Sequence, residues 1–335
     1  MARVATLTYL YSRAEFFARV PLPAEGAGNS SEVKHARMYP RPFRYHRAGS
    51  LSEAVNMLEQ AGEDARLLAG GQSLIPLMKL RLASVAHLID LNFIGGLSYA
   101  KEEDSVIRFG ALTRHAEIED SPAAQTVPIL YDCAAGIADI QVRNRGTLGG
   151  SLAEADPSGD WAPCLLTLST DVICLGPQGE RVVPLAEFIT DAYTTVLGPA
   201  ELVREVVVRR PAPRSGGAYL ALKRAAPVYA TASAAVQLTL ADDDTCLDAG
   251  IALGAIGLTP IKAIEAEAEF RGKQITEKTL ESAAQAAMAA ADPQSDKRGS
   301  AAYKRTLVGV LVRRAAEIAL RRARGEKMEA GHIYA

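Results

Sequence analysis

Two glycine-rich stretches have the residue types of a phosphate-binding site. The first is Gly70-Gly71-Gln72-Ser73, which follows a short apolar run at residues 65–69 and precedes apolar residues at helical spacing over 74–82. This order predicts a strand, a glycine turn and a helix start. The Ser73 hydroxyl and free N–H groups would then meet at the positive end of the helix dipole, where an anion is stabilised.

The second stretch is Gly146-Thr147-Leu148-Gly149-Gly150-Ser151. A run of N–H groups without side chains in the way forms a concavity that binds anions. On its own the stretch could equally be a tight connection before a helix. Two such loops, far apart in the sequence, can converge on one pyrophosphate, so together they predict a dinucleotide site. Neither follows the G-x-G-x-x-G or Walker pattern, so the common nucleotide-binding folds are not indicated.

No group of residues stands out for acid–base, nucleophilic or metal chemistry. His115 is isolated near a predicted helix start, where a capping or surface role is expected. Asp156 and Asp160 follow the second glycine stretch, and contact with a ligand's sugar or local capping is favoured over metal binding. Trp161 is expected to serve packing. The four cysteines form no C-x-x-C pair, so no zinc or iron–sulfur site is predicted in this chain.

Composition narrows the class of protein. The 335 residues suffice for two or three domains, and a hydrophobic fraction of 48% argues against wholesale disorder. The 37 basic and 39 acidic residues nearly cancel, so no global field attracts nucleic acid or anionic lipid. No apolar run approaches the roughly 18 residues that span a bilayer, and no signal peptide is evident. A cytoplasmic protein with buried, reduced cysteines is expected.

The elements that would position the glycine stretches follow in order. Residues 1–37 are predicted to be a poorly ordered extension, with a partner-binding arm as the alternative. A capping box at residues 50–53 begins a helix, a strand is predicted at His87–Asp90, and the breakers at 211–217 predict a linker. Beyond it, strands are predicted at 218–223, 232–240 and 249–256, then helices at 261–270, 277–291 and 300–323. Strands followed by segregated helices favour an α+β fold.

Taken together, three motifs resemble the FAD-binding medium subunit of molybdenum hydroxylases, such as carbon monoxide dehydrogenase and the flavin domain of xanthine dehydrogenase. They are AGGQS at residues 69–73, the sequence QVRNRGTLGGS at 141–151 followed by Ala155-Asp156-Pro157, and RGSAAY at 298–303. The resemblance extends from about residue 39 to residue 324.

The resemblance implies a fold and a division of the chain. Residues 38–213 would form an α+β, PCMH-type FAD-binding domain of the vanillyl-alcohol-oxidase type, with lobes at about 38–95 and 96–213. Residues 217–328 would form a small α+β domain like the C-terminal domain of the carbon monoxide dehydrogenase flavoprotein, with a three-stranded antiparallel sheet and helices.

The resemblance also implies which residues bind the cofactor. The pyrophosphate loops are residues 69–73 and 147–151, and Ile137, Asp160, Lys223 and Tyr229 match further positions beside the cofactor. The full expected set is Ala69, Gly70, Gly71, Gln72, Ser73, Ile137, Thr147, Leu148, Gly149, Gly150, Ser151, Asp160, Lys223 and Tyr229. Two departures are that Ser151 stands where many relatives have Asn, and Glu154 where many have His.

The implied chemistry is electron transfer through noncovalently bound FAD, with no catalytic acid or base and no metal on this chain. Molybdopterin would reside on a large partner subunit and two two-iron two-sulfur clusters on a small one, in a dimer of heterotrimers. FAD would pass the electrons to an external acceptor. The substrate and the acceptor remain open.

Two other functions are compatible with a flavin fold. A self-sufficient flavin oxidase or dehydrogenase would need its own acid–base residue over the flavin, and the sequence offers none. A binding or assembly protein without redox function would have degraded glycine loops, whereas both loops here are intact.

Overall fold

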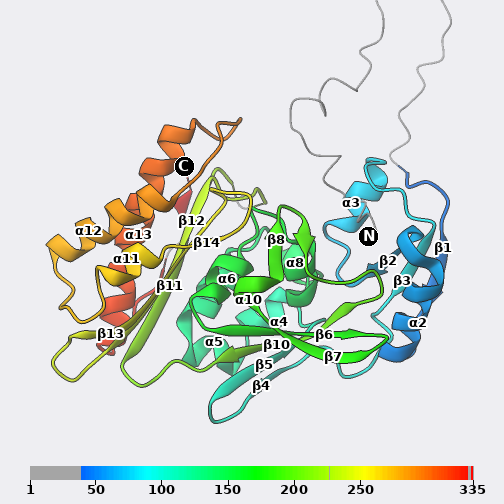
Figure 1. Ribbon diagram of the computed structural model, residues 1–335, viewed down its shortest axis with the longest axis horizontal. Helices are drawn as coiled ribbons and strands as arrows, with labels where there is room; N and C mark the ends of the chain where they lie inside the picture. The colour runs from blue at the N-terminus through cyan, green and yellow to red at the C-terminus, as the bar shows by residue number, and fades with distance from the viewer. Residues whose placement is uncertain (1–38, 226, 331–332, 335) are drawn as a thin grey trace, which may run out of the picture. The chain divides into compact units, whose positions relative to one another are not determined.

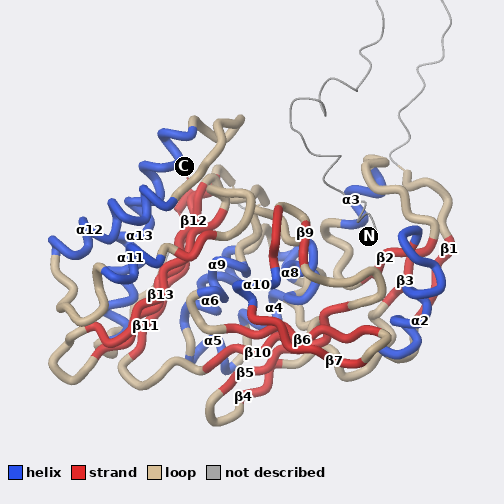
Figure 2. The backbone as a smooth tube through the Cα atoms, viewed as in Figure 1, coloured by secondary structure: helices blue, strands red, loops and turns tan. Residues whose placement is uncertain are grey.

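The structure is a computed structural model that describes residues 39–225, 227–330 and 333–334 (Figure 1). The extension predicted at residues 1–37 lies outside the described residues. Within them the strands form one three-stranded sheet, two five-stranded sheets and a two-stranded ribbon. Helices accompany each of the three larger sheets (Figure 2), so the predicted α+β class is confirmed.

The first lobe is built on a small parallel sheet. Its strands are β1 (Arg44–Arg47), β2 (Ala65–Leu68) and β3 (His87–Asp90), in the order β1-β3-β2 with both pairings parallel. Parallel strands need crossover connections, and these contain α2 (Leu51–Ala61) and α3 (Leu74–Lys79). The first glycine stretch is therefore the connection between β2 and α3, as predicted.

Helix α2 begins at the predicted cap. The Ser50 hydroxyl accepts a hydrogen bond from the Glu53 N–H at 3.1 Å, which satisfies one of the free donors of the first turn. The Glu53 carboxylate accepts from the Gly49 N–H at 2.7 Å rather than from Ser50, one residue earlier than in a standard capping box. The helix then buries three apolar residues in the core of this lobe: Ala54, Val55 and Leu58.

The second lobe is an antiparallel sheet with strand order β4-β5-β10-β6-β7 and short helices packed beside it. The strands are β4 (Ala100–Glu102), β5 (Val106–Gly110), β6 (Thr170–Gly176), β7 (Gly179–Pro184) and β10 (Leu202–Arg209). The helices are α4 (His115–Glu119), α5 (Pro122–Thr126), α6 (Pro128–Gly136), α7 (Ile140–Arg143), α8 (Leu148–Glu154), α9 (Trp161–Leu166) and α10 (Leu185–Phe188). A ribbon of β8 (Ile189–Asp191) and β9 (Thr194–Thr195) follows α10.

The C-terminal part contains the three long antiparallel strands that the sequence predicts. They are β11 (Ser215–Lys223), β12 (Ala232–Leu240) and β13 (Cys246–Gly254), and the structure adds two edge strands, β14 (Ile261–Lys262) and β15 (Ile333–Tyr334). The helices are α11 (Ile264–Ala268), α12 (Glu277–Ala290) and α13 (Ala301–Ala323). The helix predicted over 261–270 is wrong at its start, because residues 261–262 pair with β13.

This C-terminal sheet is covered by helices on both faces. Alternate residues of a strand point to opposite sides, and Tyr219 and Ala221 pack into the core of the second lobe whereas Ala218 and Leu220 pack with α12 and α13. Figure 1 shows α12 and α13 on the side of the sheet away from α6. Strands β11 and β12 are therefore mostly apolar, because both of their faces are largely buried, whereas Leu247 and Asp248 near the start of β13 are exposed.

The predicted linker is shorter than the sequence suggested. Residues 215–217 belong to β11, since they pair with residues 237–239 of β12. A Cβ on Gly216 would lie 2.2 Å from the Ala319 carbonyl oxygen of α13. The glycine thus allows a helix to approach the strand closely. Glycine at this position therefore indicates close packing, whereas the sequence suggested a linker.

Candidate functional site

The first glycine loop offers unpaired backbone donors. Gly71 has φ +75°, a conformation that favours glycine, and it turns the chain from β2 toward α3. Within the described part of the chain, the N–H groups of residues 70–73 donate no hydrogen bond. Four amides are therefore available to a ligand, and such clusters of N–H groups bind anions.

The two glycine stretches meet in space through Gly70. A Cβ on this residue would lie 2.3 Å from the Arg145 carbonyl oxygen and 2.8 Å from the Gly146 Cα atom. Both neighbouring atoms belong to backbone, which cannot swing aside as a flexible side chain can. The absence of a side chain at position 70 is therefore what lets the first lobe touch the second at this point.

The second stretch is not the run of free N–H groups that the sequence predicts. The chain itself takes up its donors: Leu148 N–H donates to the Thr113 carbonyl and Gly149 N–H to the Ala111 carbonyl, both at 3.0 Å. Thr147 caps α8, its hydroxyl accepting from the Gly150 N–H at 3.2 Å. The amides of residues 148 and 149 are held by residues more than 30 positions earlier, and the amide of residue 150 by the cap. Among the described residues of this stretch, the Thr147 N–H and the hydroxyls are the donors left for a ligand.

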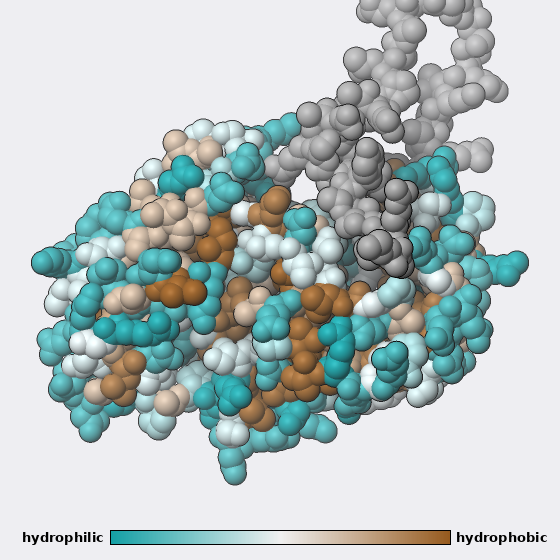
Figure 3. All heavy atoms as spheres, in the orientation of Figure 1, coloured by the Kyte–Doolittle hydropathy of each residue, from teal (hydrophilic) through white to brown (hydrophobic). Residues whose placement is uncertain are grey.

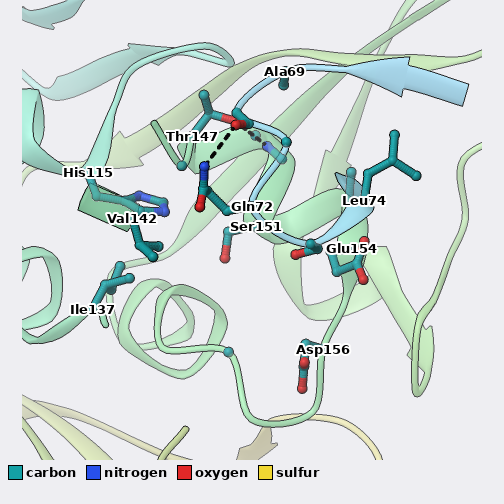
Figure 4. Close-up of a pocket in the computed structure, with 18 of the residues that line it drawn as sticks. Ala69, Gln72, Leu74, His115, Ile137, Val142, Thr147, Ser151, Glu154 and Asp156 are labelled. Atoms are coloured by element: carbon teal, nitrogen blue, oxygen red, sulfur yellow. Dashed lines mark hydrogen bonds between the residues drawn. The ribbon is translucent and has the colours of Figure 1, made fainter. Parts of the chain in front are cut away.

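A single cavity of about 500 Å³ joins the two stretches (Figure 4). Thirteen of the fourteen expected cofactor-binding residues line it: Ala69, Gly70, Gly71, Gln72, Ser73, Ile137, Thr147, Gly149, Gly150, Ser151, Asp160, Lys223 and Tyr229. Leu148 does not, because its side chain is fully buried in the core of the second lobe. Figure 4 shows His115, Val142 and Ile137 on one side of the cavity and Leu74, Ser151 and Glu154 on the other.

Lys223 and Asp160 form a buried ion pair in the cavity wall. The Lys223 Nζ lies 3.2 Å from an Asp160 carboxylate oxygen and donates to the Gly136 carbonyl at 2.7 Å. The Tyr219 hydroxyl donates to the same carboxylate at 2.7 Å. An ammonium group has three donors, so Lys223 retains one beyond these two partners. The wall therefore carries a fixed, charge-compensated polar group.

The cavity wall also carries acidic groups, among them Asp156, for which the sequence favoured contact with a ligand's sugar or local capping. Glu154 and Asp156 both line the cavity. Burial, reinforced by the nearby Asp156 charge, raises the pKa of the Glu154 carboxyl to about 7. Tyr229 lies beside them and is hydrogen-bonded to Asp156, while the Arg298 guanidinium carbon stands 5.8 Å from the centre of its ring.

Glu154 gives a testable pH dependence of stability. Its pKa of about 7 in the folded chain exceeds the roughly 4.3 of an unfolded glutamate, so protonation favours the folded state. This stabilisation is fully present below about pH 4.3 and is lost as the pH rises through 7. Relative to Glu154→Gln, the wild-type chain should lose about 2–3 kcal/mol of unfolding free energy between pH 5 and pH 8.

Urea unfolding of both proteins without flavin at several pH values measures this difference. A Glu59→Gln variant, altered at an exposed position of α2, provides the control, and its pH profile should match the wild type. Parallel profiles for wild type and Glu154→Gln would contradict the prediction.

His115 and Trp161 form a buried pair, whereas the sequence suggested a capping or surface role for the histidine. His115 is 5% exposed and Trp161 is 1% exposed. The indole Nε1–H donates to His115 Nδ1 at 3.0 Å, and His115 lines the cavity. Trp161 does pack in the core, as expected. Nothing in the sequence indicates the pairing, because the two residues are 46 positions apart.

The four cysteines, which could take part in metal or redox chemistry, lie away from the cavity. Cys133, Cys164, Cys174 and Cys246 are buried thiols, as expected, and none lines the cavity. Within the described ranges no three His, Cys, Asp or Glu side chains are placed to hold a metal ion.

Among these same residues, no helix is both long and apolar enough to cross a membrane.

Comparison with known proteins gives matches along most of the chain. A family model described as the FAD binding domain in molybdopterin dehydrogenase matches residues 41–211, and one described as the CO dehydrogenase flavoprotein C-terminal domain matches residues 217–319. The carbon monoxide dehydrogenase medium chain of Afipia carboxidovorans is 41% identical over 288 residues, covering 86% of this chain and 100% of the relative.

Further relatives and solved structures include proteins whose names state other substrates. The 6-hydroxypseudooxynicotine dehydrogenase complex subunit alpha of Paenarthrobacter nicotinovorans is 38% identical, covering 88% of this chain and all of the relative. Carbon monoxide dehydrogenase from Hydrogenophaga pseudoflava superimposes with a TM-score of 0.82 at 41% identity, over 84% of this chain and 99% of that chain. Quinoline 2-oxidoreductase from Pseudomonas putida 86 gives 0.80 at 33% identity, over 85% and 99%.

Proposed function

The chain belongs to the FAD-binding medium subunits of molybdenum hydroxylases, and we propose that it passes electrons from iron–sulfur clusters of a partner to an external acceptor. It is thus a component of an oxidoreductase, and the family expected from its motifs is confirmed. The observation that carries the electron-transfer role is the cavity itself. It combines a loop of four unpaired amides with apolar wall residues, which suits a bound flavin nucleotide.

The residues present fit FAD. Gly70 lets the two stretches approach, four unpaired amides at residues 70–73 form a cradle for an anion, and the hydroxyls of Ser73 and Ser151 lie in the same wall. We assign the pyrophosphate to the amides of residues 70–73. Residues 149–151 would contribute close backbone contact rather than N–H donors.

The rest of the wall would hold and shield the cofactor. Ile137, Val142 and Leu74 supply apolar surface that excludes water, and the Lys223–Asp160 pair supplies a fixed polar contact. Bound FAD accepts single electrons and releases them as a pair. This chain's task is to bind, orient and shield the cofactor. It needs no covalent bond to FAD for that, and we propose noncovalent binding.

We also propose the domain division expected from the sequence, with a FAD-binding domain at residues 38–213 in two lobes, at about 38–95 and 96–213, and a second domain at 217–328. Two observations support it. The strands of the three larger sheets come from three successive parts of the chain, and the two family matches meet between residues 211 and 217.

The proposed partners are a large molybdopterin subunit and a small iron–sulfur subunit, in a dimer of heterotrimers. The relatives' names support an assembly, since they are called medium chain and complex subunit. Figure 3 shows apolar residues gathered near the middle of the face that it displays. Stable interfaces have an apolar core, so such a face suits a permanent partner. Four buried free thiols support a reducing, cytoplasmic compartment.

The decisive experiment is to purify the chain with its natural partners and alone. We expect about one FAD per chain, released by heat and identified by chromatography, with molybdenum and iron only in the assembled complex. Reduction of the complex by substrate should bleach the flavin absorption, whereas substrate should leave the isolated chain oxidised. Flavin reduction by substrate in the isolated chain would instead support a self-sufficient enzyme. Absence of FAD from the complex would overturn the proposal.

A further inference from the structure

We propose that His115 donates a hydrogen bond from Nε2 to an oxygen of the bound flavin nucleotide, as a neutral ring whose orientation Trp161 fixes. The inference rests on the proposed function, because it assigns a further residue to the same site. It also adds a ring N–H donor beside the second glycine stretch, most of whose amides are bonded within the chain.

The position of the ring places Nε2 at the cavity. His115 is the first residue of α4, and its N–H donates to the Gly146 carbonyl at 3.2 Å. A Cβ on Gly146 would lie 2.6 Å from Nε2, so this nitrogen rests directly against the second glycine stretch. In Figure 4 the ring extends from its backbone toward the cavity.

The contact with Trp161 fixes the tautomer. An indole N–H can only donate, so Nδ1 of His115 must accept, and the proton of the neutral ring is on Nε2. Protonation of Nδ1 would break this bond inside the core. Burial, with the charges of Arg114 and of Arg143 on α7, lowers the pKa of His115 to about 3. The ring is therefore neutral at physiological pH.

The Nε2–H donor has no acceptor among the described residues. Nε2 is not among the buried side-chain atoms that lack a partner in the described chain, so its N–H is open to the cavity and available to a ligand. The flavin nucleotide offers acceptors on its phosphates, its sugar hydroxyls and its ring carbonyls. An oxygen of the ligand is the partner that completes this site.

The test is FAD affinity, measured by quenching of flavin fluorescence in the full chain freed of flavin. His115→Leu should weaken binding about tenfold, the loss expected for one buried hydrogen bond. His115→Gln keeps an N–H near the position of Nε2 and should recover most of the affinity. His87→Leu, altered on β3 outside the cavity, should bind as the wild type does.

Nitrogen-15 NMR of labelled histidine in the wild-type chain gives a second measurement, and this one does not depend on the folding of a variant. The wild-type His115 signals should show the neutral Nε2–H form from pH 5.5 to 8, and FAD should shift the Nε2–H proton downfield. Trp161→Phe should allow the other tautomer to appear. Unchanged affinity in His115→Leu, or a proton on Nδ1 in the wild type, overturns the inference alone. Failure of the wild type to bind FAD overturns the proposed function with it.

Discussion

Gly70→Ala is expected to reduce the affinity of the chain for FAD by about 100-fold. The added methyl group would lie 2.3 Å from the Arg145 carbonyl oxygen, so the two glycine stretches must move apart. Overpacking of this kind costs about 1–3 kcal/mol. The separation would also misplace the four amides that we assign to the pyrophosphate.

Flavin fluorescence titration of the purified variant measures the loss, and circular dichroism checks that the fold is kept. Gly95→Ala is the matched control, because a Cβ there meets no atom within 4 Å and its φ lies outside the range that disfavours side chains. The control should bind FAD as the wild type does. Equal affinity in Gly70→Ala would show that the approach of the two stretches does not form the cofactor site.

The largest loss of stability is expected from breaking the ion pair between Asp132 on α6 and Arg322 on α13. Two hydrogen bonds of 2.5 and 3.0 Å join the groups, which are 1% and 6% exposed in their side chains. Burial outweighs the guanidinium and raises the pKa of Asp132. Asp132→Ala leaves the buried Arg322 guanidinium without its counter-ion, with the Gly217 and Met328 carbonyls as its remaining partners. The variant should lower the free energy of unfolding by about 3–5 kcal/mol.

Urea unfolding at pH 7 measures this loss. Arg313→Ala serves as the control on the same helix, because its three partners, Glu277, Glu281 and Glu317, are all exposed and such surface pairs contribute about 0–1 kcal/mol each. The double variant Asp132→Ala, Arg322→Met should be more stable than the sum of the single losses predicts. Strictly additive losses would mean that the two groups are not coupled in the folded chain.

Local signals in the sequence predicted much of the fold. The capping serine at Ser50, the strand His87–Asp90 and helix α12 depend on neighbouring residues, and the structure has them where expected. Glycine was harder to interpret. Gly216 looks like a linker residue in sequence, yet it pairs with Leu238 of β12, and α13 passes close to it. Only the tertiary structure reveals these contacts.

Prediction of the site also succeeded for local signals and failed for contacts that form only on folding. Spacing and residue type identified the two glycine stretches, and the resemblance added Ile137, Asp160, Lys223 and Tyr229, but much of the apolar lining, such as Leu91, Ala111 and Leu202, was not predicted. Spacing and residue type did not show that the amides of residues 148 and 149 are already hydrogen-bonded to the carbonyls of residues 113 and 111. Nor did they show the raised pKa of Glu154 or the pairing of His115 with Trp161, since both depend on burial and on contacts made by folding.

The cavity wall extends from Arg66 to Tyr229, so it draws on both ends of a long stretch of chain. During translation, the first lobe and most of the second leave the ribosome before Lys223 and Tyr229 are made. A nascent chain that ends before Tyr229 cannot enclose the cofactor, even with both glycine stretches folded. We therefore expect cofactor loading to follow completion of β11 and of the loop after it.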